Sequence, residues 1–317
     1  MKEYRIPQND AGMRLDKFCA RVLKNAPYSF IFKMLRKKNI TLNGKKAKGN
    51  ELLQPEDLVV FYLSDETIAS FGRETADALS WENDPYEPEV VFENEQLLIV
   101  NKPDGMLSQK AGANDRSMNE YCIRYLTKNG SYNPSDPAAF KPAVCNRLDR
   151  NTSGLMLIAK THAAASMLAK ALRDRSMDKY YACIVKGTIR EAFVLNGYLK
   201  KDERTNTVTI VPDATGADRI ETAFEPLSDQ NGLTLLNVKL VTGKSHQIRA
   251  HLASIGHPIL GDPKYGDSNF NREYGCKHQL LHAYRIKMPV LTDALSDLSG
   301  REFEISFPKE FSKYMRI

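Results

Sequence analysis

An aspartate between two arginines is the part of the sequence with the clearest chemical potential. Asp149 stands between Arg147 and Arg150, just before an apolar run, GLMLIA, that is typical of a buried strand. A nearby guanidinium keeps a carboxylate ionised, and an ionised carboxylate can act as a nucleophile. Most such clusters are structural ion pairs, but a turn that enters a core strand is a common place for catalytic groups. The pattern therefore favours Asp149 as a catalytic carboxylate.

Sequence templates of several other enzyme classes do not match. The chain has neither the GxSxG of serine hydrolases nor the GxxxxGK[ST] phosphate loop. His246 and His251 lack the HExxH spacing of zinc hydrolases and would lie on different faces of a helix. A glycosidase needs a second acid beside Asp149, and spacing selects none of the available ones. These are Glu203, Asp213, Glu221 and Asp262. A single activated aspartate is what the residues alone support.

Length and composition describe an ordinary globular protein. The 317 residues are enough for one large domain or two moderate ones, with 42% hydrophobic and 26% charged residues. The N-terminal segment, MKEYRIPQND, lacks the apolar core of a secretory signal, and no apolar stretch reaches the ~18 residues of a membrane span. The five cysteines are scattered and form no CxxC pair, which favours reduced thiols over disulfides or a zinc site. We expect a cytoplasmic protein with no membrane and no metal.

The charges divide the chain into three parts. Residues 1–63 carry 13 Lys and Arg against 6 Asp and Glu, whereas residues 64–95 carry 1 against 10. Residues 96–317 are basic again, with 31 against 23. Two basic modules joined by an acidic connector suggest contact with a polyanion, although solvated lysines could account for the C-terminal excess.

The elements of residues 1–63 predict a small α/β domain with a basic surface. Leu15, Phe18 and Val22 lie on one side of a helix, and Ser29 is placed to cap a second helix. A short hairpin and a final strand follow. The outer side of the second helix predicts a basic ridge of Lys33, Arg36 and Lys37. This surface suits an RNA backbone.

This module resembles the S4 RNA-binding domain. The matching segments are RLDKF (14–18), the helix from Ser29 to Arg36, ITLNGKKAK (40–48) and the pair Leu53 and Asp57. The family often has arginine after the serine, where this chain has Phe30. The resemblance implies the S4 fold and RNA as ligand; a small basic domain that binds protein is the alternative. The candidate RNA contacts are Arg14, Lys33, Arg36, Lys37 and Lys45.

Residues 64–88 are acidic, contain glycine and prolines, and predict a linker. From residue 89 to residue 317, strands alternate with fewer helices, which predicts an α+β domain on a mixed or antiparallel sheet. Strands are expected within 90–103 and over 154–160, 179–187, 207–212 and 234–241, and helices over 161–175 and 245–256. In the last helix, Ile248, Leu252 and Ile255 should face inward.

The segment NRLDRNTSGLMLIAK (146–160) resembles the signature of the RluA family of pseudouridine synthases, HRLDxxTSGL. Four further segments agree in order and spacing, so the resemblance covers nearly the whole chain. They are 97–106 (LLIVNKPDGM), 179–187 (KYYACIVKG), 241–266 and 278–283 (HQLLHA). Asn146 replaces the common histidine, which is not the nucleophile of the family. The departure leaves the subfamily open.

The resemblance implies an RNA pseudouridine synthase that needs no cofactor and no metal. Asp149 would be the catalytic carboxylate, Tyr181 would stack on the target base, and Arg249 would pair with the carboxylate. Arg147 would fill the gap left by a flipped uridine. The remaining expected contacts are Arg150 as a structural or phosphate contact, Lys102 and Pro103 at the cleft, and Leu281 under the base.

The same resemblance orders the expected substrates and leaves a rival. Large-subunit ribosomal RNA is the first expectation and tRNA the second, for an enzyme expected to be a monomer. The rival is an RNA-binding or ribosome-assembly factor of the same fold that has lost catalysis. The sequence leaves open whether the carboxylate attacks C1′ directly or acts through a glycal.

Overall fold

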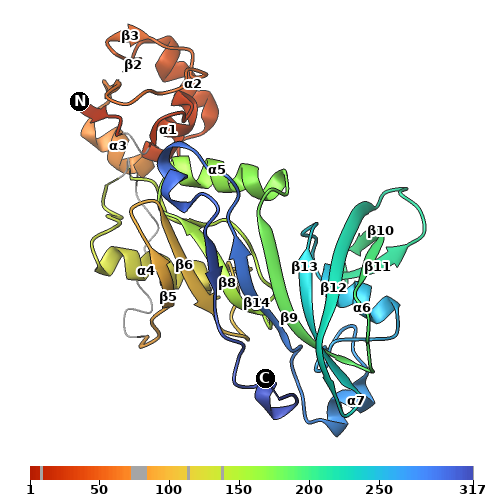
Figure 1. Ribbon diagram of the computed structural model, residues 1–317. Helices are drawn as coiled ribbons and strands as arrows, with labels where there is room; N and C mark the ends of the chain where they lie inside the picture. The colour runs from red at the N-terminus through yellow and green to blue at the C-terminus, as the bar shows by residue number, and fades with distance from the viewer. Residues whose placement is uncertain (8–9, 73–83, 113–114, 137–138, 317) are drawn as a thin grey trace.

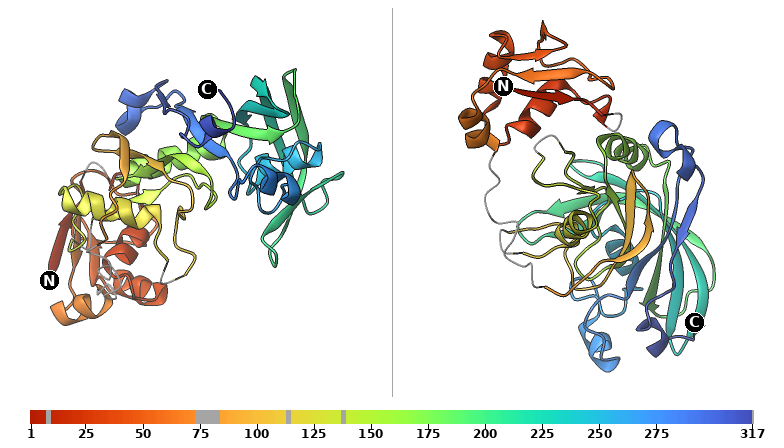
Figure 2. Two further views of the ribbon diagram at one scale, coloured as in Figure 1. Left: turned by 90° about the horizontal axis from the view of Figure 1, so that it is seen from below. Right: turned by 90° about the vertical axis from the view of Figure 1, so that its left-hand side faces the viewer.

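The computed structural model describes residues 1–7, 10–72, 84–112, 115–136 and 139–316 (Figure 1). An N-terminal domain lies beside the end of a large sheet, on the side of β5 (Glu89–Glu93) and β6 (Leu97–Lys102), and both views of Figure 2 agree on this arrangement.

The N-terminal domain is a small α/β unit. Its antiparallel sheet has the order β1 (Lys2–Arg5), β4 (Leu58–Phe61), β2 (Ile40–Leu42) and β3 (Lys45–Lys46). Its helices are α1 (Leu15–Val22), α2 (Tyr28–Arg36) and α3 (Asp65–Gly72). The predicted apolar side of α1 is confirmed, because its three apolar residues are at most 1% exposed in the domain core.

Two details of this region differ from the prediction. The second helix begins at Tyr28 after Pro27 and has no side-chain cap, so Ser29 lies inside its first turn. Residues 65–72, which were predicted to be part of the linker, form a helix. The helix packs on the N-terminal domain because burial of the apolar Ile68 side chain in that core is favourable. The rest of the predicted linker falls largely on 73–83, which lie outside the described residues.

The second domain is built on one long sheet. The path along it is β11 (Thr207–Val211), β10 (Phe193–Asp202), β12 (Asp218–Gln230), β13 (Leu233–Leu240), β9 (Asp178–Lys186), β14 (Leu281–Lys287), β8 (Ser153–Ala159), β6 and β5. At its sides, β15 (Glu302–Glu304) pairs with β14, and β7 (Ala143–Val144) pairs with β8. Among the described pairs, β14 with β8 is parallel and the others are antiparallel, which confirms an α+β fold on a mixed sheet.

Helices cover both faces of this sheet because its central strands are apolar on both sides. α4 (Met118–Lys128) and α6 (Gln247–Ser254) share one core, and α5 (His162–Arg173) lies in another (Figure 1). Along β8, Met156 faces the first core and Leu157 the second. The remaining helical elements are α7 (Ser268–Glu273) and 3-10 turns at Asp293–Leu298 and Phe311–Lys313.

The predicted inward face of α6 is correct in part. Ile248 and Leu252 are buried, whereas Ile255 is 39% exposed. The reason is the helix end: α6 stops at Ser254, and Ile255 is its C-cap, where the helical periodicity no longer sets the side-chain direction.

Candidate active site

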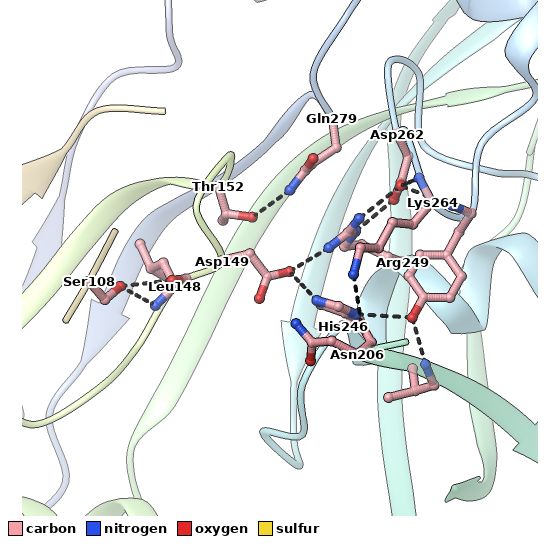
Figure 3. Close-up of polar contacts among 12 residues, drawn as sticks. Ser108, Leu148, Asp149, Thr152, Asn206, His246, Arg249, Asp262, Lys264 and Gln279 are labelled. Carbon is pink, nitrogen blue, oxygen red and sulfur yellow. Dashed lines mark hydrogen bonds and ion pairs between the residues drawn. The ribbon is translucent and has the colours of Figure 1, made fainter. Parts of the chain in front are cut away.

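The turn that carries Asp149 is anchored on both sides. The N–H of Thr152 donates to the carbonyl of Asp149 at 3.0 Å. The Ser108 hydroxyl accepts from the N–H of Leu148 at 2.9 Å and donates to its carbonyl at 2.7 Å (Figure 3). Leu148 is buried in the core, while the side chain of Asp149 is 28% exposed. The carboxylate is thus fixed in place and open to solvent.

Two residues around the turn explain how it joins β8. The side-chain oxygen of Asn146 accepts from Leu157 N–H at 2.8 Å, and its nitrogen donates to the carbonyl of Leu155 at 3.2 Å. Both ends of the Asn146 amide therefore bind the backbone of β8. Gly154 has φ +118°, and a Cβ there would be 2.2 Å from the carbonyl oxygen of Ala283. Only glycine allows β8 and β14 to approach this closely.

Arg249 of α6 bridges two carboxylates. Its Nε and Nη2 donate to Asp262 at 2.7 and 2.9 Å, and its Nη1 donates to Asp149 at 2.8 Å. The side chains of Arg249 and Asp262 are 4% and 0% exposed. A bidentate pair fixes the plane of the guanidinium, so Asp262 aims the third nitrogen at Asp149.

The charges of this cluster reinforce one another. Burial lowers the pKa of Arg249, but the hydrogen bonds and charges of Asp262 and Asp149 outweigh burial and leave the pKa raised. Burial raises the pKa of Asp262, but Arg249 and the N–H groups of Tyr265 and Lys264 outweigh it and leave this pKa lowered. Arg249 and Asp262 therefore remain an ion pair in the folded protein.

A histidine lies on the other side of Asp149. His246 Nε2 is 3.7 Å from the Asp149 carboxylate, and Nδ1 is 2.9 Å from the hydroxyl of Tyr265. The Tyr265 hydroxyl accepts a second hydrogen-bond contact, from the N–H of Val208 at 2.8 Å. Burial lowers the pKa of His246, the Asp149 charge opposes this shift, and Arg249 adds to it.

Tyr181 of β9 lies on the same side of the sheet as Leu148. The two residues share a core with Leu281, whereas Tyr180 packs on the opposite face, as strand alternation predicts. Tyr181 is 7% exposed, and burial together with the Asp149 charge raises its pKa. A protonated phenol therefore lies near the carboxylate. Leu281 also lines a cavity of about 390 Å³ next to the turn.

The two arginines beside Asp149 in the sequence are not its partners. Arg147 and Arg150 are exposed, and within the described residues the charged partner of Asp149 is Arg249 at 2.8 Å. The carboxylate therefore receives its guanidinium from 100 residues away in the sequence. Arg147 and Arg150 remain predicted RNA contacts.

Lys102 and Pro103 line the same cavity as Leu281, but the ammonium of Lys102 is held by the backbone of the protein itself. Lys102 is 0% exposed, and its ammonium donates to the carbonyls of Pro103, Met106 and Arg150 at 2.7, 2.8 and 3.0 Å. All donors of the ammonium are thus directed at backbone oxygens. Burial lowers its pKa to about 7 against the charges of Asp104 and Asp149. Lys102 therefore connects the segment after β6 to the turn that carries Asp149.

The predicted basic surface of the N-terminal domain faces solvent. Arg14 is half-exposed and makes a bidentate pair with the buried Asp16, which partly occupies its guanidinium. Lys37 caps the C-terminal end of α2 and does not lie within it. The five predicted RNA contacts, Arg14, Lys33, Arg36, Lys37 and Lys45, are all exposed.

Sequence reasoning missed three residues of the site. His246 does not fit the spacing of a zinc site, spacing does not distinguish Asp262 from three other acids, and no motif of the sequence points to Tyr265. A signal was available for Asp262, because it stands in a Gly/Pro loop, HPILGDPKYG, that a buried ion pair can anchor. No local pattern marks His246.

The described residues contain no cluster of three or more His, Cys, Asp or Glu side chains that could hold a metal ion. Within the same ranges, no helix has the length and apolar character needed to cross a membrane.

Comparisons with known proteins place this chain in one enzyme family and identify a second, N-terminal domain. Residues 96–254 match the RNA pseudouridylate synthase family, and residues 13–59 match the S4 domain. An uncharacterized RNA pseudouridine synthase of Mycoplasma pneumoniae is 32% identical over 98% of this chain and 97% of its own. Ribosomal large subunit pseudouridine synthase C of Vibrio cholerae is 31% identical over 96% of this chain and 92% of its own.

A solved structure gives the same fold. Human RNA pseudouridylate synthase domain containing 4 has a TM-score of 0.57 at 21% identity, covering 71% of this chain and 90% of that chain. With the family match, the likeness over nearly the full length and the shared fold, this chain belongs to the RNA pseudouridine synthases, isomerases that act on RNA, and has an S4 domain at its N-terminus.

Proposed function

We propose that this enzyme converts specific uridines of large-subunit ribosomal RNA to pseudouridine with Asp149 as the reacting carboxylate. The observation that carries the proposal is the state of this side chain: fixed through its turn, paired with a buried arginine at 2.8 Å, and still 28% exposed. A structural ion pair would have no need of this exposure, whereas a carboxylate that meets a flipped nucleoside requires it.

The reaction breaks the C1′–N1 bond of uridine, and the electron pair leaves with uracil. An oxygen of Asp149 either bonds to C1′ or removes the proton from C2′ to give a glycal, and both routes use the same carboxylate. The uracil then turns and C5 bonds to C1′. This bond formation releases the Asp149 oxygen from C1′ on the first route and is accompanied by return of the proton to C2′ on the second. C5 loses its proton and N1 gains one. Atoms and electrons balance without a redox partner.

The neighbouring residues have distinct tasks in this scheme. Arg249 orients the carboxylate. The Tyr181 ring stacks on the target base, with Leu281 beside it in the same core. The exposed Arg147 occupies the space that the flipped uridine vacates, which offsets the few kcal/mol of flipping. Arg150 and the basic surface of the S4 domain contact phosphates.

The relatives support ribosomal RNA as the substrate, because several matched proteins are named ribosomal large subunit pseudouridine synthase C. Transfer RNA is the second candidate. A monomeric protein in the cytoplasm, with RNA as its partner and no cofactor, completes the proposal.

Mapping of pseudouridines in total RNA tests the proposal. Cells without the gene should lack one or more pseudouridines in large-subunit RNA, and the wild-type gene should restore them. Asp149→Asn, which keeps the shape of the side chain, should not restore them. Sites confined to tRNA would overturn the substrate, and restoration by Asp149→Asn would favour a role in ribosome assembly.

A further inference from the structure

The position of His246 beside the catalytic carboxylate has no assigned purpose in the scheme above. The residue precedes α6 with φ 53° and ψ 14°, a left-handed conformation that is uncommon for a residue other than glycine. Gln247 holds this bend, since its side chain bonds to both Thr242 and Thr222 at 2.8 Å. Backbone strain of this kind persists where the surroundings impose it, and it is concentrated at functional sites.

The hydrogen bonds of Tyr265 assign the tautomer of His246. The hydroxyl accepts from the N–H of Val208, so its own proton is free for Nδ1 of the imidazole at 2.9 Å. Burial raises the pKa of Tyr265, which keeps this proton on the phenol, and burial lowers the pKa of His246. From these contacts we infer a neutral imidazole with its hydrogen on Nε2.

The Nε2 hydrogen points to the side of the site that holds Asp149. The 3.7 Å to the carboxylate is longer than a hydrogen bond, and the nearer donor to that oxygen is Arg249 at 2.8 Å. The imidazole side chain is 8% exposed, so its donor is shielded from bulk water. The Nε2–H group can therefore donate a hydrogen bond to a substrate oxygen that lies close to the sugar carbon on which Asp149 acts.

The chemistry identifies this oxygen. When the C1′–N1 bond breaks by either route, negative charge develops on uracil, and O2 is the charged oxygen bonded nearest to N1. Neutral donors directed at developing charge in a shielded site give large rate effects. We propose that His246 Nε2–H donates a hydrogen bond to uracil O2 of the flipped uridine, with Tyr265 as the positioning residue that fixes its tautomer. This inference rests on the proposed function.

Single-turnover kinetics test it, with an RNA oligonucleotide that spans a uridine mapped as above. His246→Leu should slow the reaction by about 100-fold with an RNA Kd within about threefold of wild type. His246→Gln, which keeps an N–H donor, should recover most of the rate. Tyr265→Phe should give an intermediate rate, and adding it to His246→Leu should cause no further loss. Thermal unfolding of each variant checks its fold.

Substrate analogues separate O2 from the ribose hydroxyl. With 2-thiouridine, whose sulfur is a weak acceptor, the wild-type advantage over His246→Leu should fall to a few-fold. With 2′-deoxyuridine the ratio of the wild-type rate to the His246→Leu rate should stay near 100. A fall of this ratio to a few-fold with 2′-deoxyuridine would assign the hydrogen bond to the 2′-hydroxyl and overturn the inference. A rate for folded His246→Leu within threefold of wild type would also overturn it. Wild-type turnover on the same RNA tests the proposed function separately.

Discussion

Replacing Asp262 by asparagine should show that, of the two carboxylates bound to Arg249, Asp262 mainly stabilises the fold and Asp149 mainly serves the reaction. Asp262→Asn keeps the size of the side chain and an acceptor for the N–H groups of Lys264 and Tyr265 at 2.8 and 3.0 Å. It removes the charge that compensates a guanidinium that is only 4% exposed. One nitrogen of Arg249 also faces an amide in place of a carboxylate oxygen.

The expected cost follows from the burial of the pair. Removing one partner of a buried ion pair typically costs about 3–5 kcal/mol. Because Asp149 still offers a carboxylate to Arg249, we expect the lower end, about 3 kcal/mol. Asp149→Asn is the matched control. Asp149 is 28% exposed and leaves Arg249 paired with Asp262, so its loss should cost about 1 kcal/mol or less.

Scanning calorimetry and pseudouridine formation should be measured on both full-length variants. For a catalytic domain of this size, 3 kcal/mol corresponds to a fall of about 6–12 °C in Tm. Asp262→Asn should show this fall and keep part of its turnover, whereas Asp149→Asn should keep its Tm and lose turnover. Equal falls in Tm for the two variants would refute the view that Asp262 is the structural partner of Arg249.

Four further predictions concern other parts of the molecule. Lys102→Met should lower turnover about tenfold or more through displacement of the catalytic turn, with RNA affinity unchanged. His282→Gln should flatten the pH dependence of the free energy of unfolding. Burial lowers the pKa of His282 to about 4, so between pH 7 and pH 5 the unfolded chain binds a proton that the folded chain excludes. Wild type should therefore lose up to about 2 kcal/mol of stability over this range, and the variant should not. Gly154→Ala should destabilise the protein by about 4 kcal/mol or more, measured by urea unfolding. Exchange of Lys33 and Arg36 for glutamine should reduce the slope of log Kd against log[salt] by about 1.4–1.8, measured by RNA titrations at several salt concentrations.

Each of these has a control and a contrary outcome. A reduced salt slope for Lys102→Met would return Lys102 to the phosphate contacts, and parallel pH curves for wild type and His282→Gln would contradict its neutral buried state. Gly130→Ala, at φ +81° with open space around it, should cost only about 1 kcal/mol. Exchange of the exposed Lys309 and Lys313 near the opposite end of the molecule should leave the salt slope unchanged (Figure 1).

Local patterns in the sequence predicted much of the fold. The apolar side of α1, the buried strand β8 and the alternation of Tyr180 and Tyr181 are properties of neighbouring residues, so periodicity is sufficient to find them. The pairing of Asp149 with Arg249 was reached through resemblance to a family, because the two residues are separated by 100 positions.

The incorrect and missing parts depend on contacts between distant segments. A lysine at the end of a strand is usually exposed, and the burial of Lys102 follows from the Arg150 carbonyl, whose position the local sequence does not determine. The same holds for His246, whose tautomer depends on Tyr265, and for α3, which is helical where acidic composition predicted a linker. Contacts between side chains that are distant in the sequence could not be predicted from local patterns.

The parallel pairing of β14 with β8 affects the order in which the two domains can fold during synthesis of the chain. Ser153 bonds to His282 at 2.8 Å across 129 positions, so the pairing of β8 with β14 cannot form until residue 282 has been synthesised. The N-terminal core, by contrast, uses residues from Ile6 to Ile68 alone. During translation, a nascent chain can therefore hold RNA well before it can modify it.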